Sequence, residues 1–303
     1  MPNVSYVIAK REVEAGLDET VLSVSLRSGI QHAHACGGNA RCSTCRVFIV
    51  EGVDHCAPRN AKEQALAERL HFSPDIRLAC QTTITADVKV RRLVLDEEDL
   101  QLTNQLSGGA GLSAVGEEKQ LAILFSDIRG FTPFAEALPP YDVVHVLNRY
   151  FHQMGREITR FGGCIDNYAG DGLMALFGMD DPTEAPLQAV KAGLGMLEAM
   201  ERFKPYLEAV YSRSFQIGIG INYGEVVIGE IGAENLKRVT AIGDAVNLAS
   251  RIEAANKLAG TNLLISEETY GEVKNNVKIG RTIQVSLPGK SGEYILYEVS
   301  GLA

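Results

Sequence analysis

The fold is constrained most by a break in the sequence pattern at residues 96–117. An acidic run at 96–99 (DEED) and a glycine-rich run at 107–111 (SGGAG) interrupt the periodic apolar and polar pattern found on either side. This composition is typical of a linker. With 303 residues and 46% apolar composition, the chain is long enough for two domains with separate cores. We therefore predict one domain at 1–95 and a second at 118–303.

Charge and hydropathy argue against two classes of partner. The formal net charge is -9 and no run of Lys and Arg stands out, so we expect no nucleic-acid partner. No segment approaches the roughly 20 consecutive apolar residues that a membrane-spanning helix needs. The first 30 residues also lack the basic start and apolar core of a secretory signal. We expect a cytoplasmic protein without a transmembrane segment.

Four of the six cysteines have the spacing of iron–sulfur ligands. They are Cys36, Cys42, Cys45 and Cys80. Three come from one loop, where Gly37 and Gly38 allow the sharp turns that aim backbone N–H groups at sulfur. Zinc is an alternative, although structural zinc sites usually take ligands as two close pairs and Cys80 stands alone. We expect the remaining thiols, Cys56 and Cys164, to be buried rather than ligands.

The first domain resembles a known class of electron carriers. The cysteine spacing and the segment at 46–50 (RVFIV) are similar to those of [2Fe–2S] ferredoxins with adrenodoxin-like spacing. That resemblance covers residues 1–95 and implies a β-grasp fold with a [2Fe–2S] cluster on the four cysteines. The residue pattern agrees, because β-type runs alternate with one helical stretch. The runs are Ser5–Ala9, Arg46–Val50 and Asp87–Val94, and the helical stretch is Ala61–Leu70.

The second domain is predicted to be α+β. Its apolar pattern predicts the order β-α-β-β-α-β with additions, and one sheet rich in antiparallel pairs. The predicted strands are Leu121–Phe125, Cys164–Asn167, Leu173–Phe177, Gln216–Asn222 and Glu225–Ile231. The predicted helices are Tyr141–Phe161, Leu187–Phe203 and Asp244–Ala259. The first of these helices carries one apolar face, formed by Val144, Leu147, Phe151, Met154 and Ile158.

Two aspartates occupy strand ends in a pattern that suits divalent cations. Asp127 ends an apolar strand within 125–132 (FSDIRGFT), where the chain turns into a predicted helix. Asp171 lies in a tight hairpin at 170–172 (GDG) between two strands. Carboxylates can hold ions that bridge a triphosphate. Backbone N–H groups at a helix start can receive phosphate oxygens. The predicted phosphate-binding residues are Arg129, Gly130, Phe131 and Thr132.

A second pair of polar residues lies on one predicted helix. Asn247 and Arg251 are four residues apart, so they project from the same face of a helix. A guanidinium can stabilise charge that develops on a phosphoryl group, and an amide can orient a sugar. Taken alone, such a pair is usually only a solvated helix face, and a lone Asp at a strand end is usually a turn residue or cap.

Together and in this order, these motifs resemble the catalytic domain of class III nucleotidyl cyclases. The resemblance covers residues 118–300, with its matching stretches at 125–132, 162–177, 218–232 and 242–253. It implies that Asp127, Asp171 and the carbonyl of Ile128 bind two Mg²⁺ or Mn²⁺ ions.

The same resemblance gives roles to three further residues. It implies that Arg251 neutralises the transition-state phosphoryl charge and that Asn247 positions the ribose. Lys290 is expected at the triphosphate, although the chain has Pro288 where the family often has a further Lys.

The family resemblance also implies a partner and a substrate. In this family the carboxylates and the Asn/Arg pair act from opposite subunits, so a head-to-tail homodimer is implied. Base selection falls to Asn167 and Thr240, where the adenylyl-specific family has Lys and Asp or Thr. The Asn amide can donate to adenine N1 and the Thr hydroxyl can accept from the N6 amine, which favours ATP. An amide can also turn over to accept from guanine, so GTP stays an alternative.

These features lead to one functional hypothesis and two alternatives. The hypothesis is an adenylate cyclase that forms 3′,5′-cyclic AMP and pyrophosphate, controlled by the redox state of the cluster, with an electron donor or another redox signal as a further partner. A guanylate cyclase is one alternative. A catalytically silent protein that transfers electrons or binds nucleotide is the other.

Overall fold

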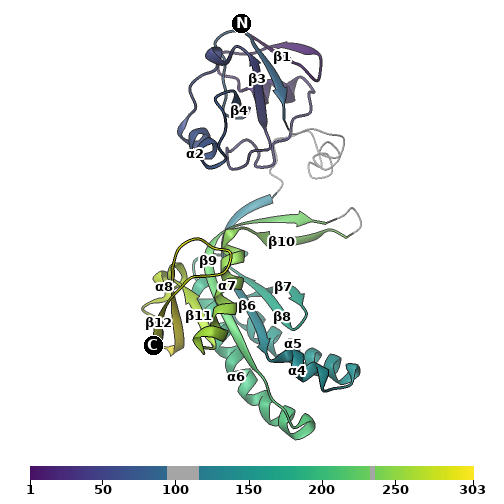
Figure 1. The fold of residues 1–303 in the computed structure, drawn as a ribbon, viewed down its shortest axis with the longest axis vertical. Coiled ribbons are helices and arrows are strands. Elements are labelled where there is room, and N and C mark those ends of the chain that lie inside the picture. Colours follow the sequence, from purple (N-terminus) through teal and green to yellow (C-terminus); the bar gives the residue numbers. More distant parts are fainter. Residues whose placement is uncertain (94–115, 233–235) are drawn as a thin grey trace. The chain divides into compact units, whose positions relative to one another are not determined.

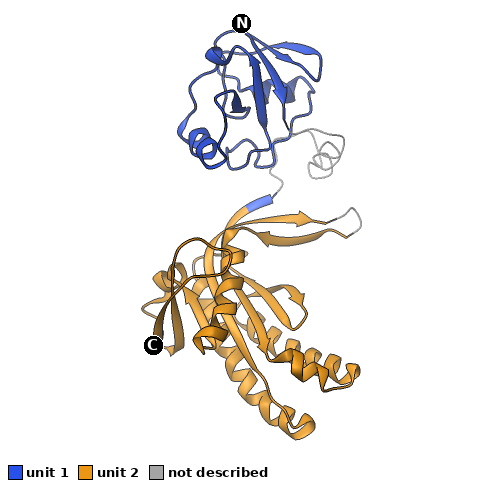
Figure 2. Ribbon diagram, in the orientation of Figure 1, with its two compact units in different colours: residues 1–117 blue, residues 118–303 orange. Residues whose placement is uncertain are grey.

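The computed structural model describes residues 1–93, 116–232 and 236–303. Figure 2 shows its two compact units, Met1–Glu117 and Glu118–Ala303. Residues 96–115 of the predicted linker lie outside the described residues, so the limits of the linker stay a prediction. Each unit has its own sheet and its own buried core.

The first unit is a five-stranded mixed sheet with two short helices (Figure 1). The strand order is β2-β1-β5-β3-β4, with β1 and β5 parallel and the other neighbours antiparallel. This arrangement confirms the predicted β-grasp fold. The elements are β1 (Asn3–Tyr6), β2 (Arg11–Glu14), α1 (Val21–Arg27), β3 (Arg46–Glu51), η1 (Val53–His55), α2 (Ala61–Arg69), β4 (Ile76–Leu78) and β5 (Val88–Arg92).

Local sequence explains where the helices of the first unit begin. The side chain of Thr20 accepts a hydrogen bond from the backbone of Ser23 and caps α1. Asn60 caps α2 in the same way. A buried ion pair then joins α2 to β4, because Arg77 donates to Glu63 at 2.9 Å and both side chains are almost fully buried. The ion pair holds α2 against the sheet that carries the cysteine loop.

The second unit is an eight-stranded sheet with helices packed on it (Figure 1). The main path is β12-β13-β11-β9-β6-β8-β7, and β10 pairs with β9. The central order β9-β6-β8-β7, with α5 and α6 as connections, confirms the predicted β-α-β-β-α-β core. The elements are β6 (Gly116–Arg129), α4 (Phe131–Glu136), α5 (Pro140–Arg160), β7 (Cys164–Ala169), β8 (Gly172–Phe177), α6 (Ala185–Tyr211), β9 (Gln216–Ile231), β10 (Arg238–Ile242), α7 (Asp244–Ala259), β11 (Leu263–Ser266), α8 (Glu267–Val273), β12 (Val277–Val285) and β13 (Tyr294–Leu302).

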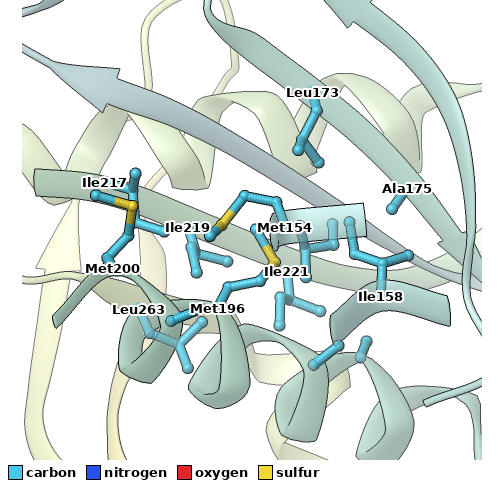
Figure 3. Packing of buried hydrophobic residues seen from close by; sticks show 14 of the residues in the cluster. Met154, Ile158, Leu173, Ala175, Met196, Met200, Ile217, Ile219, Ile221 and Leu263 are labelled. Atoms are coloured by element: carbon cyan, nitrogen blue, oxygen red, sulfur yellow. The ribbon is translucent and has the colours of Figure 1, made fainter. Parts of the chain in front are cut away.

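The main core of this unit lies between the sheet and helices α5 and α6. Figure 3 shows the methionines of the two helices packed against the isoleucines of β9. The prediction for the face of α5 was wrong at one end, because Val144 is 56% exposed. The fully buried residues of α5 follow a spacing of four, which rotates slowly around the helix. They are Val146, Tyr150, Met154 and Ile158.

Strand β9 and helix α7 lie unusually close together. The chain was predicted to form two β segments between 216 and 231, but β9 is one continuous strand. Its Gly218, Gly220 and Gly224 face α7, and a Cβ at Gly220 would lie 2.1 Å from a backbone nitrogen of that helix. The glycines therefore serve close packing rather than a turn.

Helix α6 is the longest in the described part of the chain, at 27 residues, and it contains Pro205. None of the helices within the described ranges is both long enough and apolar enough to cross a membrane.

Candidate functional site

The four predicted cluster ligands lie together as two pairs. Cys36 and Cys42 form one hydrogen-bonded pair, and Cys45 and Cys80 form the other. The bond from the Cys42 thiol lowers the pKa of Cys36 to about 4, and the bond from Cys45 lowers the pKa of Cys80 to about 7. Each pair therefore contains a thiol that readily becomes the thiolate that binds metal.

The backbone of the cysteine loop is also arranged for anionic sulfur. Backbone N–H groups of Asn39, Arg41 and Cys42 reach the sulfur of Cys36, and that of Ala40 reaches Cys80. The loop can turn this sharply because Gly37, Gly38 and Ala40 all have positive φ. The structure thus shows the predicted amide-lined loop.

This donor set fits a binuclear cluster better than one metal ion. In a [2Fe–2S] cluster each iron takes two thiolates, which matches the two pairs. Structural zinc, the alternative left open by the sequence, would instead need all four thiolates around one ion.

Three polar side chains support the cysteine loop. Thr44 Oγ1 lies 3.1 Å from the sulfur of Cys42, and Gln81 Nε2 donates to the sulfur of Cys80 at 3.3 Å. His32 is buried, and its ring lies 3.3 Å from the carbonyl oxygen of Cys45. These side chains add hydrogen bonds on the sulfurs and orient one ligand through its backbone.

The two remaining cysteines differ from each other. Cys56 is half-buried against the core of the first unit, so the prediction of a buried thiol holds there only in part. The prediction was wrong for Cys164, which is exposed. Cys164 lies at the start of the edge strand β7, where the sheet ends and one side of the strand has no neighbour in the sheet as far as the described residues go.

Asp127 and Asp171 lie side by side in the second unit. Asp127 is one residue beyond Ser126, which pairs with Leu173 of β8, and Asp171 stands in the predicted hairpin between β7 and β8. The two carboxyl groups are within hydrogen-bonding reach. Burial and then the charge of Asp127 raise the pKa of Asp171 to about 6. Two carboxylates held this close repel each other and favour a bound cation.

A third carboxyl group near this pair was missed in the sequence. Glu253 of α7 is buried enough that its pKa rises to about 7, with the charges of Asp127 and Asp171 as further causes. It points toward Gly218 of β9, where a side chain would collide with it. The sequence did offer a signal for Glu253. It lies two residues after Arg251, so it projects from a different side of the helix, and that side faces a glycine-rich strand.

The residues predicted to contact phosphate fall into two groups. Gly130 has a φ of 69° and leads into helix α4, which begins at Phe131 and includes Thr132, so the predicted turn into a helix is confirmed. The guanidinium of Arg129 instead donates to the carbonyl of Thr261, and burial lowers its pKa. A role for these residues in binding phosphate stays a prediction.

Asn247 and Arg251 both lie on helix α7, as predicted, and both are exposed. The guanidinium of Arg251 approaches the loop between β12 and β13 near Gly289. In that loop, Lys290 forms an ion pair with Asp244 at the start of α7. The loop and the helix therefore bring Lys290 to the same helix as Asn247 and Arg251.

Two further residues form hydrogen bonds with the predicted base-selecting residues. Asn167 of β7 accepts a hydrogen bond from Arg238 at 2.7 Å. Thr240 of β10 donates to Asp166 at 2.7 Å. Asn167 and Thr240 can be found from sequence, but Arg238 and Asp166 cannot, because these contacts span more than 70 positions in the chain.

Known families match both units of the chain. Residues 114–301 match the family described as the adenylate and guanylate cyclase catalytic domain. Residues 7–85 match the 2Fe-2S iron-sulfur cluster binding domain. The two matches correspond to the two units that the structure separates.

Several curated relatives are cyclases. An adenylate cyclase of Anabaena cylindrica is 36% identical over 188 residues, which cover 60% of this chain and 37% of that protein. The terminal-differentiation specific adenylate cyclase of Dictyostelium discoideum is 36% identical over 184 residues, covering 60% of this chain and 9% of that protein. The chain thus spans less than two fifths of the length of either relative.

Solved structures of both nucleotide specificities are similar to the second unit. The guanylyl cyclase Cya2 has a TM-score of 0.58 and 35% identity over 62% of this chain and 95% of its own. The adenylyl cyclase CyaB from P. aeruginosa has a TM-score of 0.56 and 33% identity over 60% and 94% of the two chains. The cyclase match covers more than half of the chain. The chain therefore belongs to the adenylate and guanylate cyclase catalytic-domain family, and a 2Fe-2S iron-sulfur cluster binding domain precedes the cyclase domain in the sequence.

Proposed function

We propose that this chain is an adenylate cyclase, which converts ATP to 3′,5′-cyclic AMP and pyrophosphate. The observation that carries the proposal is the close pair of carboxyl groups on Asp127 and Asp171 at the end of β6 and in the β7–β8 hairpin. In the reaction, the 3′-hydroxyl oxygen of ATP attacks the α-phosphorus and releases its proton to solvent. The bond between the α-phosphorus and the α,β-bridging oxygen breaks, and that oxygen leaves with pyrophosphate.

The acidic pair would hold two Mg²⁺ or Mn²⁺ ions, with the carbonyl of Ile128 as a further ligand. When bound, the ions make the 3′-hydroxyl more acidic and stabilise the departing pyrophosphate. The protein supplies the site by holding two carboxylates at one junction of strands. The pKa of Asp171, raised to about 6 by burial and then by the charge of Asp127, supports this role, because a bound cation stabilises both carboxylates in their charged form.

The transition-state groups would come from a second copy of the chain. Asn247 and Arg251 stand exposed on α7, where they can reach a nucleotide bound to the acidic pair of a partner. Arg251 would neutralise charge on the transferring phosphoryl group, and Asn247 would orient the ribose. The active form would then be a head-to-tail homodimer with two shared sites.

Product identification tests the proposal directly. The purified protein is incubated with ATP or GTP and Mn²⁺, and the cyclic product is identified. We expect cyclic AMP from the wild type and none from Asp127→Ala, with the visible absorbance of the cluster unchanged. Glu198→Gln is the matched control, because it removes an exposed carboxylate on α6 that is 77% accessible. Turnover by Asp127→Ala would refute the assignment of the metal site.

Guanylate cyclase is the second candidate, and it has one specific observation behind it. Cya2, a guanylyl cyclase, is among the similar structures. Asn167 is neutral where the adenylyl-specific family has Lys, so base choice rests on how its amide is oriented. Cyclic GMP as the main product in the same assay would establish this alternative. The absence of any cyclic product would favour a silent electron-transfer or nucleotide-binding protein.

We also propose that the redox state of a [2Fe–2S] cluster controls the cyclase. The cluster would be held by Cys36, Cys42, Cys45 and Cys80. Cyclisation of ATP involves no net electron transfer, so a cluster has no part in the chemistry, yet reduction changes its charge by one unit. Such a change can bias an equilibrium between conformations.

Turnover with ATP is therefore measured for oxidised, reduced and cluster-free protein. The background is Cys164→Ser, because the exposed Cys164 thiol could respond to an oxidant by itself. We expect the oxidised and reduced proteins to differ. Equal turnover in all three states would end the proposal of redox control.

A further inference from the structure

We propose that the groove between helices α5 and α6 is an anion site that binds a small polyphosphate, a molecule in which two or more phosphoryl groups are joined. The two helices pack against each other in the second unit (Figure 1). None of the residues proposed for catalysis lines this groove. The inference therefore goes beyond the proposed function.

Helix α5 carries a row of basic residues along one face. His145, Arg149, His152 and Arg156 follow each other at intervals of three or four residues, so their side chains project from the same side of the helix. All four are exposed. Together with Arg202 of α6 they line a cavity of about 670 Å³. Small-molecule sites commonly have volumes of about 300–1,000 Å³.

Two guanidinium groups of the cavity have no acidic partner. Arg149 and Arg156 form neither an ion pair nor a hydrogen bond with any side chain that the structure describes. Arg160 and Arg202, in contrast, each pair with Glu157 at 3.4 Å. The Glu157 carboxylate also lines the cavity, but its charge is already shared by these two partners.

The unpaired row is unfavourable without a ligand. Like charges on one helix face repel each other. The chain as a whole carries a net charge of -9, so a local excess of positive charge is not a consequence of its composition. An anion in the cavity would turn this repulsion into attraction.

Aromatic contacts hold one of the guanidinium groups in place. Arg149 Cζ lies 4.0 Å from the centre of the Tyr206 ring and 5.9 Å from that of Phe203. The hydroxyl of Tyr206 lies 3.3 Å from Nε2 of His145. A guanidinium over an aromatic ring keeps N–H groups free to donate. Because Arg149 is already ordered, less side-chain entropy is lost when an anion binds.

The spacing of the free guanidinium groups favours joined phosphoryl groups. A guanidinium can donate two parallel hydrogen bonds to one phosphoryl group. Arg149 and Arg156 are seven residues apart, which is about 10 Å along the helix axis. One phosphate satisfies one of them, whereas a chain of phosphates can meet both as the long side chains converge. An acidic peptide spreads its charges along a backbone, and a polyphosphate concentrates them in a single cavity.

Binding of inorganic pyrophosphate to the full chain tests the inference. Isothermal titration calorimetry is carried out in EDTA, because without divalent ions the acidic pair of Asp127 and Asp171 repels the anion. Arg251→Ala is titrated alongside, since it reports any binding at the proposed catalytic site. Orthophosphate and a poly-glutamate peptide are titrated as alternative anions.

Three substitutions locate the bound anion. Arg156→Gln removes one free guanidinium, and Arg149→Lys keeps the charge of the other but removes its paired donors. Arg213→Gln is the matched control, because Arg213 is also exposed and also lacks an acidic partner among the described residues, and it lies outside the groove. Thermal unfolding of each variant checks its fold.

We expect the wild type to bind one pyrophosphate per chain, and orthophosphate at least about tenfold more weakly. Arg156→Gln should weaken binding about tenfold or more at an unchanged or higher Tm, and Arg149→Lys should weaken it less. Arg213→Gln and Arg251→Ala should bind as the wild type does.

Four results would overturn the inference. They are no binding by the wild type, an equal loss in Arg213→Gln, a loss in Arg251→Ala, and tighter binding of the poly-glutamate peptide than of pyrophosphate. Binding to vesicles of phosphatidylcholine and phosphatidylinositol bisphosphate, without binding of free pyrophosphate, would assign the groove to a membrane surface and overturn it as well. Since no turnover is measured, the result does not depend on whether the chain is a cyclase.

Discussion

Two carboxyl groups near the candidate metal site hold their protons more tightly than usual. The pKa is about 6 for Asp171 and about 7 for Glu253, and burial is the largest cause for both. The ordinary values are about 3.9 for Asp and 4.3 for Glu. A raised pKa in the folded state contributes stability that is fully present below the ordinary value. It is lost as the pH rises through the folded value. Without metal, the second unit should therefore lose stability between about pH 4 and pH 7.

The substitution Asp127→Asn tests this at one residue. It removes the charge that raises the pKa of both Asp171 and Glu253. We expect a higher Tm than the wild type at pH 7.5 in metal-free buffer, although activity is lost. At pH 5 the difference should shrink, because Asp171 is then mostly protonated. Calorimetry at the two pH values gives the answer, and an unchanged or lower Tm at pH 7.5 would contradict it.

Single residues show what the sequence could and could not predict about the site. The acidic pair and the Asn/Arg pair could be found because each lies in a short local motif. Asp166 and Arg238 could not, since they become significant only when β7 and β10 meet. Glu253 could be identified only once the strand that it faces was known. Local motifs thus identify groups that bind, whereas the groups that orient them depend on tertiary contacts.

At the scale of elements, the contact between β9 and α7 positions Asn247 and Arg251, the proposed transition-state groups. Asn222 of β9 is buried and donates to the carbonyl of Ala245 at 3.0 Å, which anchors the start of α7. Further along the strand, Gly220 leaves room for the helix backbone at Glu253. The positions of Asn247 and Arg251 therefore depend on this glycine-lined contact.

The substitution Gly220→Ala should push α7 away from the sheet. The new Cβ would lie 2.1 Å from the backbone nitrogen of Glu253 and 2.7 Å from the carbonyl oxygen of Ala249, and backbone atoms cannot turn aside. Overpacking of this kind costs about 1–3 kcal/mol or more. We expect a lower Tm and a large loss of turnover, measured by thermal unfolding and cyclic-nucleotide assay.

The control is Gly271→Ala in helix α8, where nothing lies within 4 Å of the new Cβ. Alanine favours a helix over glycine by about 0.5–1 kcal/mol, so this variant should be slightly more stable and fully active. Equal Tm and equal turnover in the two variants would show that the β9–α7 contact does not position the site.

The sequence predicted most elements of the second unit but misread β9. The predicted strands ended at Asn222 and began again at Glu225, yet Gly224 between them lies inside one strand, where a Cβ would be 3.0 Å from that of Ala245. Glycine signals a turn and a close contact equally well, and only the position of α7 distinguishes them. Strand β10 was not predicted either. It is short, and within the described residues it pairs only with β9.

At the scale of the whole molecule, the proposed dimer predicts complementation. In a head-to-tail dimer each site takes its carboxylates from one chain and Arg251 from the other. Asp127→Ala and Arg251→Ala should each be inactive alone. When equal amounts exchange subunits, half of the dimers are mixed and each mixed dimer has one intact site of two, so about a quarter of wild-type turnover should return. No recovery after verified subunit exchange would exclude shared sites.

The buried side chains of the first unit form one cluster, drawn from residues 4–90, and those of the second unit form others, drawn from residues 121–299. Neither half, as far as the described residues go, depends on the other to fill its interior. A gene fusion could therefore replace the cysteine-bearing half with a light- or ligand-responsive domain without repacking the cyclase. Failure to assemble a cluster in the first unit should correspondingly leave the second unit folded.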